Sequence, residues 1–519
     1  MVGKRRRGIR TSLGIANKKF SFRGSRLLFL LLFLSSILLR LYLIYLRKFP
    51  AGDEIWAYLL TKADFKNIWF ATLADFHGPF YFLFLHAIKI IFPVELTIVH
   101  VRLVSLLFGI AGSLALWSLG SRALGKRGGL FLFYLSLFLP GYVWASIYAR
   151  YYSFLILLTT ISLIFFLDFL RKGEIKYLIY LTILSVLGAF THYYFLLLDF
   201  SFFIFFVFER RYRYLLKKWI FALGAILIFC IPLFVAFLTL QKPEISGRIY
   251  NEILKIPSVL IANLTSWETF LYLYYWGNPI IYVPILLALF VSTGVLLCIS
   301  LFNWKNKIKF LFAYIFFFPP AAGIAVSYTL EPLLAVGSLI IFLPALLLLI
   351  LKAILTLFKF RGIIVSVFVL SIFLSLILFF QSSYTYSVPR RDFQFISDNI
   401  HDGDIIISSH FGSFLMSTYY LGSRITILGI RDKKTSTYLT QKALGYKVIT
   451  VESLLNLKNR IWYLEPYYGV TDEARKIKQA LDNNFKLVKK EIFNPEKKYK
   501  ENFEFFNVYL YFPSNLSNF

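Results

Sequence analysis

Long runs of apolar residues alternate with short polar segments over most of this chain. The first run, RLLFLLLFLSSILLRLYLIYL, covers residues 26–46. A helix of about 20 apolar residues is long enough to cross the hydrocarbon core of a bilayer. The run is too long for the apolar part of a signal peptide, so we interpret it as a retained span. The same criterion predicts about 11 transmembrane helices, at residues 27–46, 100–120, 130–147, 152–170, 177–194, 195–208, 219–240, 280–302, 310–329, 333–351 and 362–381.

Positive charge is concentrated in the segments between alternate spans. These segments hold 26 Lys and Arg but only two acids, Glu174 and Glu209, and so carry 24 of the 29 net positive charges of the chain. Such a bias marks cytoplasmic loops and argues against a nucleic-acid footprint. The segments placed in the cytoplasm are 1–26, 121–129, 171–176, 209–218, 303–309 and 352–361.

This placement puts residues 47–99 and the C-terminus outside the cytoplasm, because the number of spans is odd. Residues 77–92, HGPFYFLFLHAIKIIF, are apolar but few, and they carry His86 and Lys89. We expect them to form a helix lying in the outer interface. The alternative, a short span with a shifted topology, remains open.

The pattern changes near residue 384. Residues 385–519 carry 19 Lys and Arg and 14 Asp and Glu, with no long apolar run. Short β-branched and aromatic runs predict strands, and an amphipathic segment predicts a helix over 471–484 with Thr471 as its N-cap. The predicted strands are 404–409, 447–451, 460–464 and 504–512.

The predicted fold is therefore a polytopic α-helical membrane protein with a C-terminal extracytoplasmic α/β domain, in a cell membrane. We divide it into a cytoplasmic N-terminus (1–26), a multi-span membrane domain (27–383) with the outer loop 47–99, and the α/β domain (384–519).

Polar side chains gather at the outer ends of the predicted spans. Taken singly, an Arg or His there is most simply an interfacial anchor, and two adjacent acids are a solvated pair. Together, a carboxylate with Arg and His nearby can deprotonate a hydroxyl beside a bound phosphate. These residues are Asp53, Glu54, His77, Arg102, Arg150, His192 and Glu331.

Six short motifs in order over residues 27–200 resemble one family. They are LLRLYLIYL, GDE, HGPFYFLFLH, VRLVSLLFG, YARYYSF and THYYF. The family is that of the membrane C-type glycosyltransferases, in the branch of the dolichyl-phosphate-mannose protein mannosyltransferases and the lipid A aminoarabinose transferases. Two positions depart from its pattern: Gly78 replaces a common Pro, which we expect to loosen the turn, and Tyr148 replaces a frequent Glu.

The resemblance implies an inverting transfer of a sugar from a polyprenyl-phosphate donor to a hydroxyl acceptor on a protein, lipid or polysaccharide. It implies Asp53 as general base, with Glu54 supporting it or sharing a metal. Donor phosphate contacts would come from His77, Arg102, Arg150 and His192, the first and third best supported. No cofactor is required by the sequence; a divalent metal, if used, would lie at Asp53 and Glu54.

Two other classes remain open from the sequence. A transporter or flippase of lipid-linked sugars would show repeated halves and ionisable groups near the bilayer midplane. This chain shows neither clearly, since its polar groups lie mainly at outer ends. A non-catalytic membrane scaffold would tolerate alanine at the outer residues.

Overall fold

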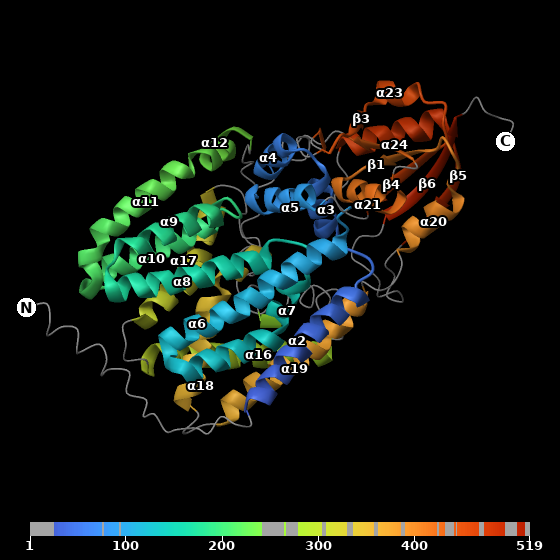
Figure 1. Ribbon diagram of the computed structural model, residues 1–519. Helices are drawn as coiled ribbons and strands as arrows, with labels where there is room; N and C mark the ends of the chain where they lie inside the picture. Colours follow the sequence, from blue (N-terminus) through green and yellow to red (C-terminus); the bar gives the residue numbers. More distant parts are fainter. Residues whose placement is uncertain are drawn as a thin grey trace, which may run out of the picture.

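The computed structural model describes residues 25–74, 77–92, 95–240, 264–265, 279–303, 308–329, 336–357, 362–385, 390–422, 425–430, 441–442, 444–466, 472–493 and 506–513. Within these residues, apolar helices form a bundle, and a small sheet with its own helices lies at one end of it (Figure 1). A multi-pass helical membrane protein with a C-terminal sheet is therefore confirmed. Glu331 and Thr471 lie outside the described residues.

Helices occupy most of the described residues in the segments predicted as spans, while residues 190–194 of the fifth form a turn. Six of the described helices are long and apolar enough to cross a membrane, and others are shorter apolar helices, so the number of about 11 stays a prediction. The bundle contains α2 (Ser25–Leu46), α6 (Ile98–Phe138), α7 (Pro140–Ile147), α8 (Tyr152–Lys172), α9 (Ile175–Ala189), α10 (Phe195–Phe208), η1 (Arg210–Leu215), α11 (Leu216–Phe229), α12 (Ile231–Leu240), α16 (Pro279–Asn303), α17 (Ile308–Thr329), η2 (Val336–Phe342), α18 (Leu343–Leu357) and α19 (Gly362–Thr385).

A buried arginine ties α2 to the break between α6 and α7. Pro140 cannot donate a backbone hydrogen bond, so the last carbonyls of α6 need other donors. Arg40 supplies them: its Nη1 donates to Leu137 O at 2.9 Å and its Nη2 to Ser136 O at 3.2 Å, while Nε donates to Ser146 Oγ at 2.8 Å. The turn that follows α7 is thereby attached to the first span.

Three short helices follow α2 and lie between the bundle and the sheet domain (Figure 1). They are α3 (Gly52–Lys62), α4 (Phe65–Ala74) and α5 (Phe80–Ile91). The 12 residues of α5 extend over only about 18 Å at 1.5 Å per residue, well short of a bilayer core of about 30 Å. This length supports the interfacial interpretation of residues 77–92.

The C-terminal sheet has the strand order β3-β2-β1-β4-β6-β5. The first four strands in that order run parallel, and β6 joins β4 and β5 antiparallel. The strands are β1 (Ile405–Ser408), β2 (Thr426–Ile430), β3 (Lys447–Ile449), β4 (Ile461–Pro466), β5 (Phe485–Glu491) and β6 (Phe506–Pro513), and the helices are α20 (Arg391–Asn399), α21 (Phe411–Leu421), α23 (Val451–Leu455) and α24 (Asp472–Asn484).

The four predicted strands and the predicted helix are all present, and β2 and β5 were not predicted. Helix α21 packs on α3, where the rings of Tyr419 and Tyr58 meet edge to face at 5.8 Å. The sheet domain therefore contacts the helix that carries the two candidate catalytic acids.

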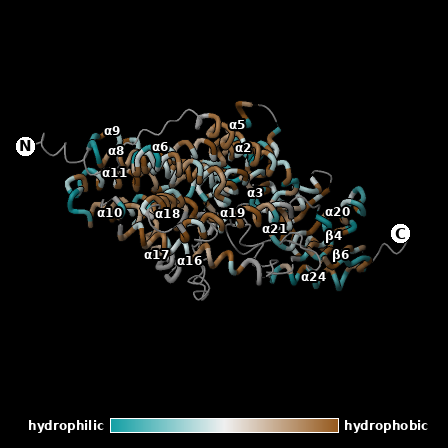
Figure 2. The backbone as a smooth tube through the Cα atoms, turned by 90° about the horizontal axis from the view of Figure 1, so that it is seen from below, coloured by the Kyte–Doolittle hydropathy of each residue, from teal (hydrophilic) through white to brown (hydrophobic). Residues whose placement is uncertain are grey.

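Hydropathy is distributed along the long axis of the molecule. Hydrophobic segments fill the middle of the bundle, and hydrophilic ones gather at the sheet domain and at the opposite end, near α9, α10 and α11 (Figure 2). A membrane layer between two polar ends accounts for this pattern.

Candidate active site

The two adjacent acids of the outer loop lie in the first turn of α3. Acids are favoured there because the helix N-terminus carries partial positive charge. Successive residues of an α-helix point about 100° apart, so the two carboxylates cannot share one surface. The Asp53 side chain is 60% exposed, whereas that of Glu54 is fully buried.

Glu54 is the centre of a buried ionic cluster. Arg102, near the start of α6, donates to both of its oxygens, from Nε at 2.8 Å and from Nη2 at 2.7 Å. Arg47 Nη2 lies 3.5 Å away, and the Ala149 N–H donates at 3.0 Å. Burial alone would raise the pKa of Glu54, but the two arginines and this N–H lower it to about 2. Glu54 thus joins α2, α3, α6 and the turn after α7 as a permanent anion.

Asp53 faces the guanidinium of Arg150 instead. Its Oδ2 lies 3.8 Å from Arg150 Nη2, which is an ion pair too long for a good hydrogen bond. Arg150 belongs to the turn between α7 and α8, and Ser105 Oγ of α6 donates to its backbone carbonyl at 3.2 Å. An exposed carboxylate therefore lies beside a cation that is fixed by the bundle.

Aromatic rings surround the Arg150 guanidinium. Its Cζ lies 4.8 Å from the ring centre of Trp56 and 5.3 Å from that of Tyr151, at cation–π distances. Its Nε and Nη1 are buried and make no hydrogen bond of good geometry among the described residues, although Tyr152 interacts with it electrostatically. Burial lowers the pKa of Arg150, but Asp53 and these phenols outweigh it and raise the pKa, so the charge is permanent.

His77 accepts a hydrogen bond from Nη2 of that guanidinium. Arg150 Nη2 lies 3.2 Å from His77 Nε2, and Tyr151 Oη lies 3.3 Å from Nδ1. An arginine can only donate, so Nε2 must be the unprotonated nitrogen and Nδ1 must carry the hydrogen. Burial, Arg150 and His192 all lower the pKa of His77 well below its ordinary value. The imidazole is therefore neutral at physiological pH.

The turn that holds His77 is clamped against the turn that holds His192. The Phe80 N–H donates to Phe190 O at 2.8 Å, and a Cβ on Gly78 would collide with the same carbonyl. The prediction that Gly78 loosens this turn is therefore wrong, because glycine is what permits the close approach. The rings of His77 and His192 lie 5.9 Å apart as a result.

The structure thus brings Asp53, His77, Arg150 and His192 together and places Glu54 with Arg102 behind them. Sequence analysis did not single out Trp56 or Tyr151. Trp56 follows Asp53 by three residues, the spacing that puts two side chains on one face of a helix, so periodicity within α3 could have found it. Tyr151 adjoins Arg150 in the same turn.

A divalent metal does not fit the pair Asp53 and Glu54. Both Glu54 oxygens accept from Arg102, and a second arginine lies beside them. A cation placed there would meet two guanidinium groups. Among the described residues, no cluster of three or more His, Cys, Asp or Glu side chains could hold a metal ion.

Comparison with known proteins agrees with the resemblance seen in the motifs. Residues 76–237 match the family model described as dolichyl-phosphate-mannose-protein mannosyltransferase, and this stretch contains His77, Arg102, Arg150 and His192. No curated protein matches the chain significantly by sequence.

The fold is similar to that of a solved structure. The chain is similar to ArnT from Cupriavidus metallidurans bound to undecaprenyl phosphate, with 12% sequence identity and a TM-score of 0.57, over 93% of this chain and 98% of that one. Against ArnT from the same organism in the apo state, the identity is 12% and the TM-score 0.48, over 94% and 99% of the two chains. The family match over residues 76–237 thus confirms the resemblance to the dolichyl-phosphate-mannose protein mannosyltransferases, and the fold similarity to ArnT agrees with it.

Proposed function

We propose that this protein is a glycosyltransferase that moves a sugar from a polyprenyl-phosphate donor to a hydroxyl acceptor at the outer face of a cell membrane. The family match over residues 76–237 and the ArnT-like fold support the reaction class. The ArnT structure bound to undecaprenyl phosphate supports a polyprenyl phosphate as the carrier.

The pairing of Asp53 with Arg150 carries the proposal. A transfer of this kind needs a base open to an incoming hydroxyl and a cation for the phosphate that leaves. Asp53 is open to solvent, and the guanidinium of Arg150 is held 3.8 Å away, buried among the rings of Trp56 and Tyr151.

The reaction proceeds as a single displacement with inversion. The acceptor hydroxyl loses its proton to Asp53 while its oxygen attacks the anomeric carbon. The bond from that carbon to the phosphate oxygen breaks, and its electron pair leaves with the polyprenyl phosphate. Arg150 meets the negative charge that grows on this oxygen, and the neutral His77 keeps Arg150 oriented through Nε2.

Glu54 and Arg102 position the site without touching substrate. Arg102 is fully engaged with Glu54 and with the carbonyl of Arg47, so we do not place it on the donor phosphate. His192 lines the site beside His77 and Tyr151. The mechanism uses no metal, because the carboxylate that would complete a metal site already binds two arginines.

Transfer of a radiolabelled sugar tests the proposal. Membranes containing the protein are incubated with a series of labelled polyprenyl-phosphate sugars, and label bound covalently to protein, lipid and polysaccharide is separated. We expect the wild type to transfer one label, and Arg150→Ala to lose about 10²-fold or more of that rate. Arg150→Lys should recover only part, because lysine lacks the planar fork that binds two oxygens.

Arg211→Ala is the matched control, since this exposed arginine lies in η1 at the other end of the bundle. It should transfer label at the wild-type rate. Label that crosses the membrane without forming a covalent product would instead identify a flippase, and full transfer by Arg150→Ala at normal expression would remove that residue from the site.

A further inference from the structure

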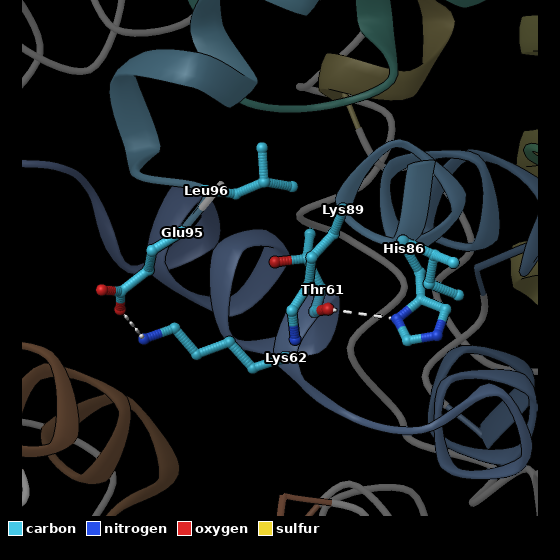
Figure 3. A pocket seen from close by; sticks show the side chains of 7 residues that line it. Thr61, Lys62, His86, Lys89, Glu95 and Leu96 are labelled. Carbon is cyan, nitrogen blue, oxygen red and sulfur yellow. Dashed lines mark hydrogen bonds and ion pairs between the residues drawn. The ribbon is translucent and has the colours of Figure 1, made fainter. Parts of the chain in front are cut away.

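A hollow lies at the opposite end of α3 from Asp53. It has a volume of about 630 Å³ and is formed between the C-terminal turn of α3, helix α5 and the residues that precede α6. Lys62, His86 and Lys89 surround it from two helices (Figure 3). The transfer reaction proposed above uses none of these side chains.

The hollow carries more positive than negative groups. Its one acid, Glu95, pairs with Lys62 at 3.4 Å, but the two side chains are 81% and 44% exposed. An exposed ion pair of this kind is weak, so a stronger anion can replace Glu95. Lys89 adds a second ammonium group with three donors.

His86 of α5 also lines the hollow. Its Nδ1 lies 3.2 Å from the Thr61 carbonyl, which can only accept, so Nδ1 carries the hydrogen. This bond holds the ring between α3 and α5. The donors that the hollow offers to phosphate oxygens are therefore the ammonium groups of Lys62 and Lys89.

An apolar surface adjoins the cations. Ile90, Ile91 and Phe92 end α5 directly after Lys89, and they are 68%, 68% and 61% exposed. Such a cluster is costly in water but is stable in the acyl region just below the headgroups. Cations next to apolar side chains on a short interfacial helix are the pattern of binding to an anionic lipid.

We propose that this hollow binds the phosphate of an anionic phospholipid of the outer leaflet. Lys62 and Lys89 hold the phosphate, and the acyl chains lie along Ile90, Ile91 and Phe92. A free phosphate would gain nothing from the apolar part of the site. Bound lipid would anchor the C-terminal end of α3, whose first turn carries Asp53.

Native mass spectrometry of the detergent-purified full chain tests this proposal by binding alone, so a failure of the transferase proposal would not affect it. The protein is titrated with dioleoylphosphatidylglycerol and, separately, with dioleoylphosphatidylcholine. Lys62→Gln with Lys89→Gln should weaken the tightest phosphatidylglycerol binding about thirtyfold, since each basic residue at a membrane surface contributes about 1 kcal/mol and about 1.4 kcal/mol is a factor of ten. Phosphatidylcholine binding should not change.

Lys48→Gln with Lys66→Gln is the control, because it removes the same charge from two other exposed lysines of the outer loop; it should bind as the wild type does. Glu95→Gln should bind phosphatidylglycerol more tightly, and this exposed change tests the site even if the double lysine variant does not fold. Unchanged binding in the variants of the hollow would overturn the proposal. Displacement of the lipid by millimolar inorganic phosphate would show a site for a free anion and would overturn the lipid assignment.

Discussion

At the scale of single residues, Asp53 and Glu54 adjoin in sequence, yet their carboxylates occupy opposite environments. Asp53→Asn keeps the size of an exposed side chain but cannot accept a proton, so turnover should fall about 10²-fold or more while thermal stability stays unchanged. Glu54→Gln should instead destabilise the protein by about 3–5 kcal/mol, because it leaves Arg102 and Arg47 buried beside a neutral amide. Thermal unfolding and sugar transfer, measured on both variants in one detergent, separate the two roles.

Acid provides an independent check on Glu54. A carboxylate whose pKa is lowered on folding stabilises the folded state above its unfolded pKa, and this stabilisation is lost as the pH falls. For Glu54 this stabilisation should be lost between pH 4.5 and about 2, and Glu54→Gln should lose less stability over that range than the wild type.

Near-normal turnover in Asp53→Asn would refute its assignment as the base. Equal thermal stability in Glu54→Gln and wild type would refute the ionic cluster.

At the scale of elements, the contact between the His77 turn and the His192 turn depends on Gly78. Gly78→Ala should lower the free energy of unfolding by about 1–3 kcal/mol, since the new Cβ must push away the Phe190 carbonyl. Sugar transfer should fall as well, because His77 orients Arg150. The measurements are thermal unfolding and label transfer. Gly224→Ala in α11 is the control: nothing lies within 4 Å of its Cβ, so the helix should be unchanged or slightly more stable.

The sequence predicted elements where periodicity was strong and missed them where it was weak. Apolar runs located the bundle helices because a bilayer leaves the backbone few other options. Strand β5, FKLVKKE, begins at Phe485, directly after α24 ends at Asn484, so no turn residue separates helix from strand. Strand β2, TILGI, is short and contains Gly429, which weakens a strand signal.

The sequence predicted which residues belong to the candidate site better than it predicted how they pair. Charged residues at the outer ends of spans can be seen in a sequence. That Asp53 pairs with Arg150 and Glu54 with Arg102 depends on the rotation of α3 and on tertiary contacts. The anchoring role of Arg40 was equally hidden. An arginine inside an apolar run signals a buried partner, but the carbonyls it bonds lie about 97 residues away along the chain.

At the scale of the whole molecule, the hydrophilic segments near α9, α10 and α11 and the sheet domain lie at opposite polar ends of one apolar layer (Figure 2). Because lysine and arginine accumulate on the cytoplasmic side, the sheet domain, α3 and the proposed site should face outward. Cysteine labelling tests this orientation in a background of Cys230→Ser and Cys298→Ser. Lys126→Cys, in the basic segment of α6, should react in intact cells only with a membrane-permeant maleimide. Lys476→Cys, on the exposed face of α24, should also react with an impermeant one. Labelling in the reverse pattern would put Asp53 in the cytoplasm, where an acceptor at the outer surface could not reach it.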